Sequence, residues 1–120
     1  MKNVKIINYG LILAATIIAT SANAGTLNGK YECLIKAMDL NFILEFKANN
    51  KYKQDMEFVG IEKGNYSSNG KIISFSPTEN TRNGKKKNTQ TPYKRNIISN
   101  SGNTLIMTNI NDSDKITCKK

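Results

Sequence analysis

Apolar and polar residues alternate with a period of two along much of this chain, and no other feature constrains its fold as strongly. One run sets Leu40, Phe42, Leu44 and Phe46 against Asn41, Ile43, Glu45 and Lys47. The next run sets Tyr52, Gln54, Met56 and Phe58 against Lys53, Asp55, Glu57 and Val59. Successive side chains of a β-strand point to opposite faces, so this period predicts strands with one buried face.

Short segments rich in Asn and Gly separate the alternating runs. They lie at residues 48–51, 68–70, 100–103 and 111–114, and both residue types tolerate the positive φ that tight hairpins require. Counting between them predicts eight strands, at residues 30–36, 41–47, 52–59, 62–67, 71–75, 93–99, 104–110 and 115–119. Short strands at such regular spacing are typical of an all-β meander.

One predicted connection, residues 76–92, is much longer than the others. It holds both prolines of the chain and the segment Asn83-Gly84-Lys85-Lys86-Lys87. A loop longer than about 12–15 residues without secondary structure of its own is usually functional or disordered. We therefore expect one of these two properties here.

The first 24 residues have the pattern of a secretory signal peptide. Lys2 and Lys5 form a positive segment, residues 11–19 are apolar, and a small-x-small pattern ends at Ala24. The apolar run is far shorter than the roughly 20 residues that span a bilayer. Cleavage after Ala24 would leave one domain, residues 25–120, with a net charge of +7 instead of +9. We expect a bacterial protein that is periplasmic or secreted and does not span the membrane.

Cys33 and Cys118 are the only cysteines, and both lie in the part that we expect to be exported. An even number of cysteines in an oxidising compartment indicates a disulfide. Cys33 lies nine positions after Ala24, too far from the cleavage site for a lipid anchor. The chain has no histidine to activate a catalytic thiol, and two thiols alone make a poor zinc site. We expect neither a metal nor a cofactor.

The positions of the two cysteines agree with a closed sheet. A meander of eight antiparallel strands has two exposed edges, and closing the sheet into a barrel removes both. In a closed barrel the first strand pairs with the last, and the predicted first and last strands hold Cys33 and Cys118. The prediction is a single eight-stranded antiparallel up-and-down barrel, with the disulfide crossing the seam where the barrel closes.

Several short motifs carry a family resemblance. They are Leu27-Asn28-Gly29-Lys30-Tyr31, Ile43-Leu44-Glu45-Phe46, Lys51-Tyr52, Gly64-Asn65-Tyr66, Gly70-Lys71-Ile72-Ile73-Ser74-Phe75 and Asn103-Thr104-Leu105-Ile106-Met107. Together they resemble small bacterial lipocalin-like domains of the calycin type, whose Gly-x-Trp motif has Tyr31 here in place of Trp. The resemblance implies a lipocalin-like barrel in which Tyr31 plugs one end. It also implies that Lys119 or Lys115, in place of the usual Arg, stacks over this plug.

Catalysis is poorly supported by the residue types present. Without histidine, acid–base chemistry would fall to carboxylates such as Glu45, Asp55, Glu57 and Glu62. Three of these four fall at outward positions of the predicted strands, so solvated strand surface explains them better than an active site does. We expect that the protein is not an enzyme.

The inward rows of the predicted strands would either line a pocket or fill the barrel. The candidate pocket residues are Phe42, Leu44, Gln54, Met56, Phe58, Tyr66 and Phe75. An eight-stranded barrel has an interior that side chains can just fill, or one that holds a single small ligand. Because the strands are short and the inward residues bulky, we expect a filled or nearly filled barrel, with Gln54 as a polar exception.

Basic residues gather in and after the long loop, at Lys85, Lys86 and Lys87 and again at Tyr93-Lys94-Arg95. Such a cluster would bind an anionic surface, such as lipid phosphates, acidic polysaccharide or an acidic protein. The alternative is a run of charge that only keeps the protein soluble. We expect no specific recognition of nucleic acid, because basic charge alone gives sequence-independent binding.

Three functions remain open from the sequence. The first is a non-enzymatic exported binding module, which recognises a protein or an anionic envelope component through barrel-end loops. The second is a lipocalin-type carrier of a small apolar ligand. The third is a periplasmic inhibitor, such as those of c-type lysozyme, or an immunity protein or toxin. A basic protein is badly matched to a basic lysozyme.

Overall fold

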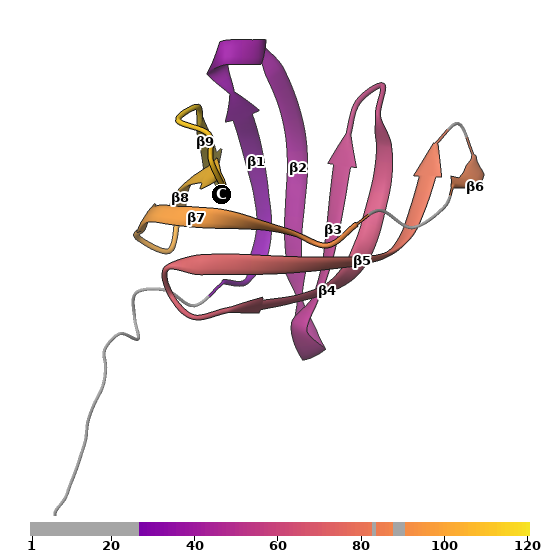
Figure 1. Ribbon diagram of the computed structural model, residues 1–120, viewed down its shortest axis with the longest axis horizontal. Helices are drawn as coiled ribbons and strands as arrows, with labels where there is room; N and C mark the ends of the chain where they lie inside the picture. Colours follow the sequence, from indigo (N-terminus) through magenta and orange to yellow (C-terminus); the bar gives the residue numbers. More distant parts are fainter. Residues whose placement is uncertain (1–26, 83, 88–90) are drawn as a thin grey trace, which may run out of the picture.

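The alternating runs form strands in the computed structural model, which describes residues 27–82, 84–87 and 91–120 (Figure 1). In chain order the strands are β1 (Gly29–Ile35), β2 (Leu40–Lys47), β3 (Lys51–Met56), β4 (Gly60–Ser68), β5 (Ile72–Arg82), β6 (Lys85–Lys87), β7 (Tyr93–Asn100), β8 (Thr104–Asn109) and β9 (Lys115–Lys119). Two 3-10 turns, η1 (Lys36–Met38) and η2 (Ala48–Asn50), follow β1 and β2. The expected signal peptide lies outside the described residues. Within the described part of the chain, no helix is long and apolar enough to cross a membrane.

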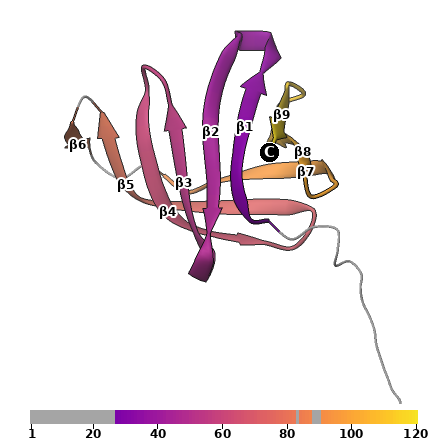
Figure 2. The ribbon, with the colours of Figure 1, turned by 180° about the vertical axis from the view of Figure 1, so that it is seen from behind.

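Eight of the strands close into an antiparallel up-and-down barrel, as the sequence predicts. Hydrogen-bonded neighbours follow the order β1–β2–β3–β4–β5–β7–β8–β9, and β9 pairs with β1 to complete the circle. β6 pairs with β5 alone, so the β5–β6 hairpin projects beyond the barrel wall (Figures 1 and 2).

The seam between β1 and β9 carries the predicted disulfide. Cys33 and Cys118 face each other directly in the register, with their Cα atoms 3.9 Å apart and an S–S bond of 2.06 Å. Both cysteines are buried on the inner face. The seam therefore combines a covalent bridge with an antiparallel ladder. A disulfide also fits a protein that folds in an oxidising compartment.

The prediction of a long loop over residues 76–92 is wrong for much of that span. Residues 76–82 continue β5, and Lys85–Lys87 pair back onto it as β6. Pro77 is tolerated because it faces Gly64 where the β4–β5 register shifts, and proline is accepted in sheets at such bulges. An ideal Cβ on Gly64 would lie 2.2 Å from the Ser76 carbonyl oxygen, so only glycine allows the two strands this approach. Residues 83 and 88–90 lie outside the described part.

The two barrel ends follow from the antiparallel topology, because alternate connections lie at the same end. We call upper the end that holds η1, residues 57–59, the β5–β6 hairpin and residues 110–114, and lower the opposite end (Figure 1). Aromatic rings occupy the lower and middle interior. Ring centroids lie 4.9 Å apart for Phe46 and Tyr66 and for Tyr52 and Phe75. These bulky inward residues form the core from which the site above it is built.

Tyr31 lies at the lower end, fully buried, and its hydroxyl donates to the Gly102 carbonyl at 3.0 Å. The Lys120 ammonium lies 5.2 Å from the Tyr31 ring centroid and donates to Asn28 Oδ1. The aromatic residue thus occupies the end of the barrel with a cation over it. The prediction that this cation is Lys119 or Lys115 is wrong, because both occupy exposed positions of β9, whereas Lys120 follows the strand and lies over the Tyr31 ring.

Candidate functional site

A buried carboxylate lies inside the upper half of the barrel. Glu62, on β4, is 5% exposed, and its Oε2 accepts hydrogen bonds from the Tyr52 hydroxyl at 2.6 Å and the Tyr93 hydroxyl at 2.5 Å. Register places Gln54 and Asn80 on either side of Glu62 in the neighbouring strands, and both are also buried. The upper part of the barrel interior is therefore polar, whereas the lower and middle parts are aromatic.

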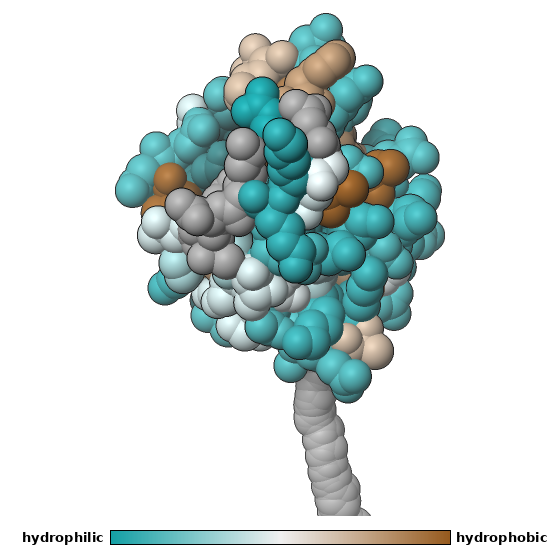
Figure 3. All heavy atoms as spheres, turned by 90° about the vertical axis from the view of Figure 1, so that its right-hand side faces the viewer, coloured by the Kyte–Doolittle hydropathy of each residue, from teal (hydrophilic) through white to brown (hydrophobic). Residues whose placement is uncertain are grey.

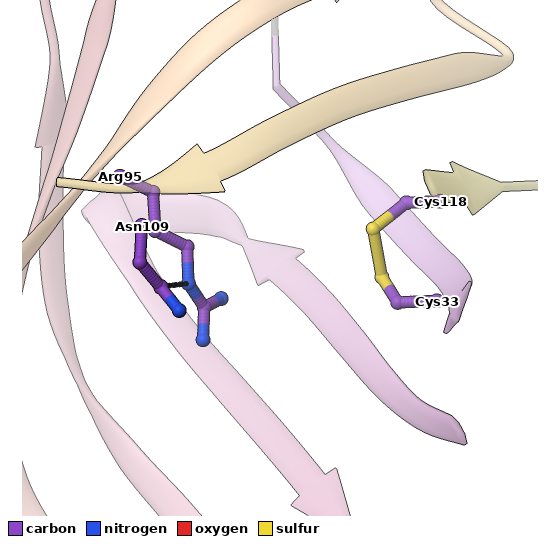
Figure 4. The surroundings of a disulfide bond; sticks show 4 residues. All are labelled: Cys33, Arg95, Asn109 and Cys118. Carbon is purple, nitrogen blue, oxygen red and sulfur yellow. Dashed lines mark hydrogen bonds between the residues drawn. A yellow bond between two sulfur atoms is a disulfide. The ribbon is translucent and has the colours of Figure 1, made fainter. Parts of the chain in front are cut away.

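Arg95 is the cation of this interior and is only 5% exposed. Its guanidinium carbon lies 5.0, 5.3 and 5.6 Å from the ring centroids of Phe75, Tyr93 and Phe42. Its Nε donates to Asn109 Oδ1 at 3.3 Å, between the neighbouring strands β7 and β8 (Figure 4). Three aromatic faces therefore stabilise a buried cation, as expected for cation–π contacts within about 6 Å.

Burial shifts the titration of these groups. Desolvation, followed by the hydrogen bond to Glu62, raises the pKa of Tyr52. Desolvation also raises the pKa of Tyr93, although nearby Arg95 opposes this shift. The pKa of Arg95 is lowered by desolvation and partly restored by Tyr93 and Glu62. The tyrosines therefore remain protonated donors to the carboxylate.

Two buried polar atoms of this interior, Gln54 Oε1 and Arg95 Nη1, have no hydrogen-bond partner in the described part of the chain. Buried polar atoms normally have a partner, either protein or ordered water. One is an acceptor and the other a donor, and both belong to side chains of the polar interior. The hydrogen bonds of Tyr52 and Tyr93 to Glu62, and of Arg95 to Asn109, connect β3, β4, β7 and β8 inside the barrel.

The candidate pocket residues mostly face inward. Phe42, Leu44, Gln54 and Phe75 are buried, and Met56 and Tyr66 pack against the core. Phe58 is the exception, because it is 85% exposed. The chain leaves β3 at Met56, and Phe58 adopts a left-handed conformation with φ 68°, which ends the alternation. The prediction that Phe58 faces the barrel interior is therefore wrong.

An exposed apolar and cationic surface forms at the upper end instead. We call it the tip surface and define it by Phe58, Val59, Arg82, Lys85 and Lys86, all exposed. The β3–β4 turn, which carries Phe58 and Val59, adjoins the β5–β6 hairpin, which carries the cations. An ideal Cβ on Gly60, next to Val59, would lie 2.5 Å from the carbonyl oxygen of Thr81, next to Arg82. Figure 3 shows the side of the molecule with the β5–β6 hairpin, where hydrophobic patches interrupt a largely hydrophilic surface.

The predicted basic cluster divides between this surface and the interior. Lys85, Lys86 and Lys94 are exposed, whereas Tyr93 is half-buried and uses its hydroxyl on Glu62. The prediction that Arg95 belongs to a binding surface is wrong, because β7 turns this side chain inward opposite Ile73. The side chain of Lys87 lies outside the described part.

The lysines of β6 also have a structural explanation. Among the residues that the structure describes, the three-residue strand β6 pairs with β5 alone and is therefore an open edge of the sheet. Natural proteins protect such edges with short strands and lysines, which oppose pairing with another chain. Edge protection alone does not explain the exposed Phe58 beside them.

A hollow of about 770 Å³ lies on the outer wall, over β9, β1, β2 and β3. Carboxylates of Glu32, Asp55 and Glu57 line it together with lysines and the apolar side chains of Leu34 and Ile43. Its mixed charge favours no single class of ligand. The described residues contain no group of three or more His, Cys, Asp or Glu side chains arranged to hold a metal ion.

The sequence predictions grouped Glu62 with carboxylates that mostly face outward and Arg95 with exposed basic residues, so the burial of both was missed. The signal was nevertheless present. Glu62 shares its parity with the inward Tyr66, and Arg95 lies between Tyr93 and Ile97 in the same inward row. When the period-two pattern is continued through β4 and β7, it places both charged residues in the inward rows.

In comparisons with known proteins, no protein-family model, curated protein or solved structure matches this chain.

Proposed function

We propose that this protein is a non-enzymatic, exported binding module that recognises its partner through the tip surface at the upper end of the barrel. The partner class is a protein or an anionic component of the cell envelope. The observation that carries the proposal is Phe58, an aromatic side chain that is 85% exposed at the apex of a turn.

Phe58 contributes little to folding and carries a conformational cost. A left-handed backbone conformation in a bulky residue costs of order 1–3 kcal/mol, and such strain clusters at functional sites. Because the side chain is 85% exposed, its ring buries little surface in the described protein. Aromatic residues are common among the residues that contribute most to binding. An exposed, strained Phe is therefore better explained by a contact with a partner than by the fold.

The cations beside Phe58 support the same surface. Arg82, Lys85 and Lys86 are exposed on the adjacent β5–β6 hairpin, which projects from the barrel. Clustered charge of one sign accelerates association with an oppositely charged partner. The interior supports carriage of an apolar ligand less well, because aromatic rings occupy its lower part and polar groups its upper part.

The test places a photo-reactive phenylalanine derivative at position 58 and, as a control, at Ala48 on the lower end. Both positions are exposed. Irradiation of the intact bacterium that encodes the protein should give adducts from position 58 that are absent from position 48. Adducts to a protein or to an envelope component both support the proposal. Equal labelling at the two positions, or none at position 58, would overturn it.

A stability measurement separates binding from folding. Asparagine tolerates the left-handed conformation, so Phe58→Asn should leave the melting temperature unchanged or raise it. A marked fall would show that Phe58 supports the fold, and the strain argument for a binding role would fail.

A further inference from the structure

We propose that the partner of the tip surface is an anionic phospholipid bilayer, with the Phe58 ring inserted among the lipids and the hairpin cations on the headgroups. This inference rests on the proposed function and names the partner of the same site. Four observations carry it: exposure of the ring, its place on a convex turn, the cations beside it and the projection of the hairpin.

The geometry suits shallow insertion. Phe58 lies at the apex of the tight turn between β3 and β4, which the Val59 N–H closes on the Met56 carbonyl at 3.0 Å. Val59, half-exposed, follows on the same turn. An apolar apex on a rigid hairpin can enter the boundary between headgroups and acyl chains, as the apolar faces of interfacial segments do.

Positive charge is the second property of the tip surface that suits an anionic bilayer. The tip surface has three cations, Arg82, Lys85 and Lys86, and the exposed carboxylate of Glu57 directly precedes Phe58. The other exposed carboxylates of the upper end, Asp39, Asp112 and Asp114, lie on connections next to β1 and β9, outside the tip surface. Basic residues next to an anionic membrane each increase binding roughly fivefold. Cations beside an apolar apex therefore fit a surface that is anionic outside and apolar a few ångströms deeper.

A bilayer fits better than an acidic protein for reasons of shape. Residues that dominate protein interfaces usually fill pockets in the centre of a closely packed patch. Phe58 is instead the most exposed large hydrophobic residue described, and it projects from a turn. A fluid bilayer accepts a projecting ring without a preformed pocket. A further apolar residue, Met38, is also exposed at the upper end, on η1.

Vesicle binding tests the inference directly, with protein exported and processed by a bacterial host. Vesicles of phosphatidylglycerol and phosphatidylcholine in equal parts should bind it in a sedimentation assay, and pure phosphatidylcholine should bind it much less. The Lys85→Ala/Lys86→Ala variant should bind the anionic vesicles roughly 30-fold more weakly. The matched control, Lys47→Ala/Lys51→Ala, removes the same charge from the lower end and should bind within about twofold of the parent.

Insertion of position 58 can be measured by tryptophan fluorescence, because the chain contains no tryptophan of its own. Phe58→Trp places a single indole at the apex, and its emission should shift to the blue when anionic vesicles are added. Ala48→Trp, at the lower end, should show no shift. Phe58→Asn should weaken binding roughly tenfold or more through lost apolar burial. Circular dichroism and melting curves of every variant establish that it is folded.

The outcomes separate this inference from the proposed function. Absence of binding to anionic vesicles, or binding that Phe58→Asn leaves unchanged, overturns the lipid assignment. A protein adduct from position 58 in intact cells, combined with absence of vesicle binding, keeps the proposed function but replaces the bilayer by a protein. Equal blue shifts from positions 58 and 48 would show non-specific adsorption and would also overturn the inference.

Discussion

Breaking the disulfide between Cys33 and Cys118 should lower stability strongly without abolishing the barrel. The two cysteines are separated by 85 positions in the sequence. In the chain-entropy model, a loop of this length in the unfolded chain corresponds to about 4.5 kcal/mol at 25 °C. For a domain of this size that lowers the melting temperature by roughly 20 °C. It is a large part of the total, since domains are typically stable by about 5–15 kcal/mol.

The barrel should still close after reduction, because the seam does not depend on the covalent bond alone. β1 and β9 remain paired from Glu32 opposite Lys119 to Ile35 opposite Ile116. Both cysteines are almost fully buried, so the protein must be reduced while unfolded and then refolded in reductant. Urea unfolding followed by circular dichroism compares this sample with the oxidised protein.

If the disulfide acts by restricting the unfolded chain, a second prediction follows, which the loss of buried sulfur atoms would not produce. Without the bridge the unfolded chain is more expanded, so the dependence of unfolding free energy on urea should become steeper. Cys33→Ala combined with Cys118→Ala should lose stability by a similar amount, plus a small term for the two missing sulfur atoms. Equal melting temperatures for oxidised and reduced protein would refute the argument, as would an unfolded reduced protein.

Three further predictions concern the interior. Tyr93→Phe removes one of the two hydroxyl donors to the buried Glu62 carboxylate, so urea unfolding should show a loss of roughly 1.5–3 kcal/mol; a loss below about 0.5 kcal/mol would contradict a stabilising role for this hydrogen bond. Raised tyrosine pKa values mean that the folded protein keeps protons that the unfolded chain releases near pH 10. Stability should be complete below about pH 10 and fall above it, with phenolate absorbance and dichroism changing in one transition for Tyr31, Tyr52, Tyr66 and Tyr93. Gly64→Ala places a methyl group against the Ser76 carbonyl and should cost roughly 1–3 kcal/mol in the same urea assay; a neutral effect would mean that the bulge relaxes freely.

Much of the fold could be predicted because its determinants are local. Period-two alternation gives the strand faces, Asn and Gly mark the hairpins, and strand number with cysteine position predicts closure at the seam. Prediction failed over residues 76–82, where Pro77 was read as the beginning of a loop. Proline is compatible with β5 only because Gly64, thirteen positions earlier, has no side chain to obstruct it. That compatibility belongs to a strand pair, which no local pattern reveals.

The candidate surface could be predicted only in part. Lys85 and Lys86 are exposed as expected, but Arg95 belongs to the interior, where aromatic rings from β2, β5 and β7 surround its guanidinium. Phe58, the residue on which the proposed function depends, continues the alternation of β3 in sequence but lies beyond the point where the strand ends. The exact end of a strand depends on its neighbours and on turn geometry.

The sequence by itself determined the all-β class, the closing pair Cys33 and Cys118 and the inward row from Phe42 to Phe46, because each depends on spacing along one chain. Only the tertiary structure decided which charges are buried and which apolar side chain is exposed. Burial of Glu62 and Arg95 requires hydroxyls and rings from other strands, and exposure of Phe58 requires a turn at the end of the barrel. Such properties arise when distant residues meet, so they emerge only from the closed barrel.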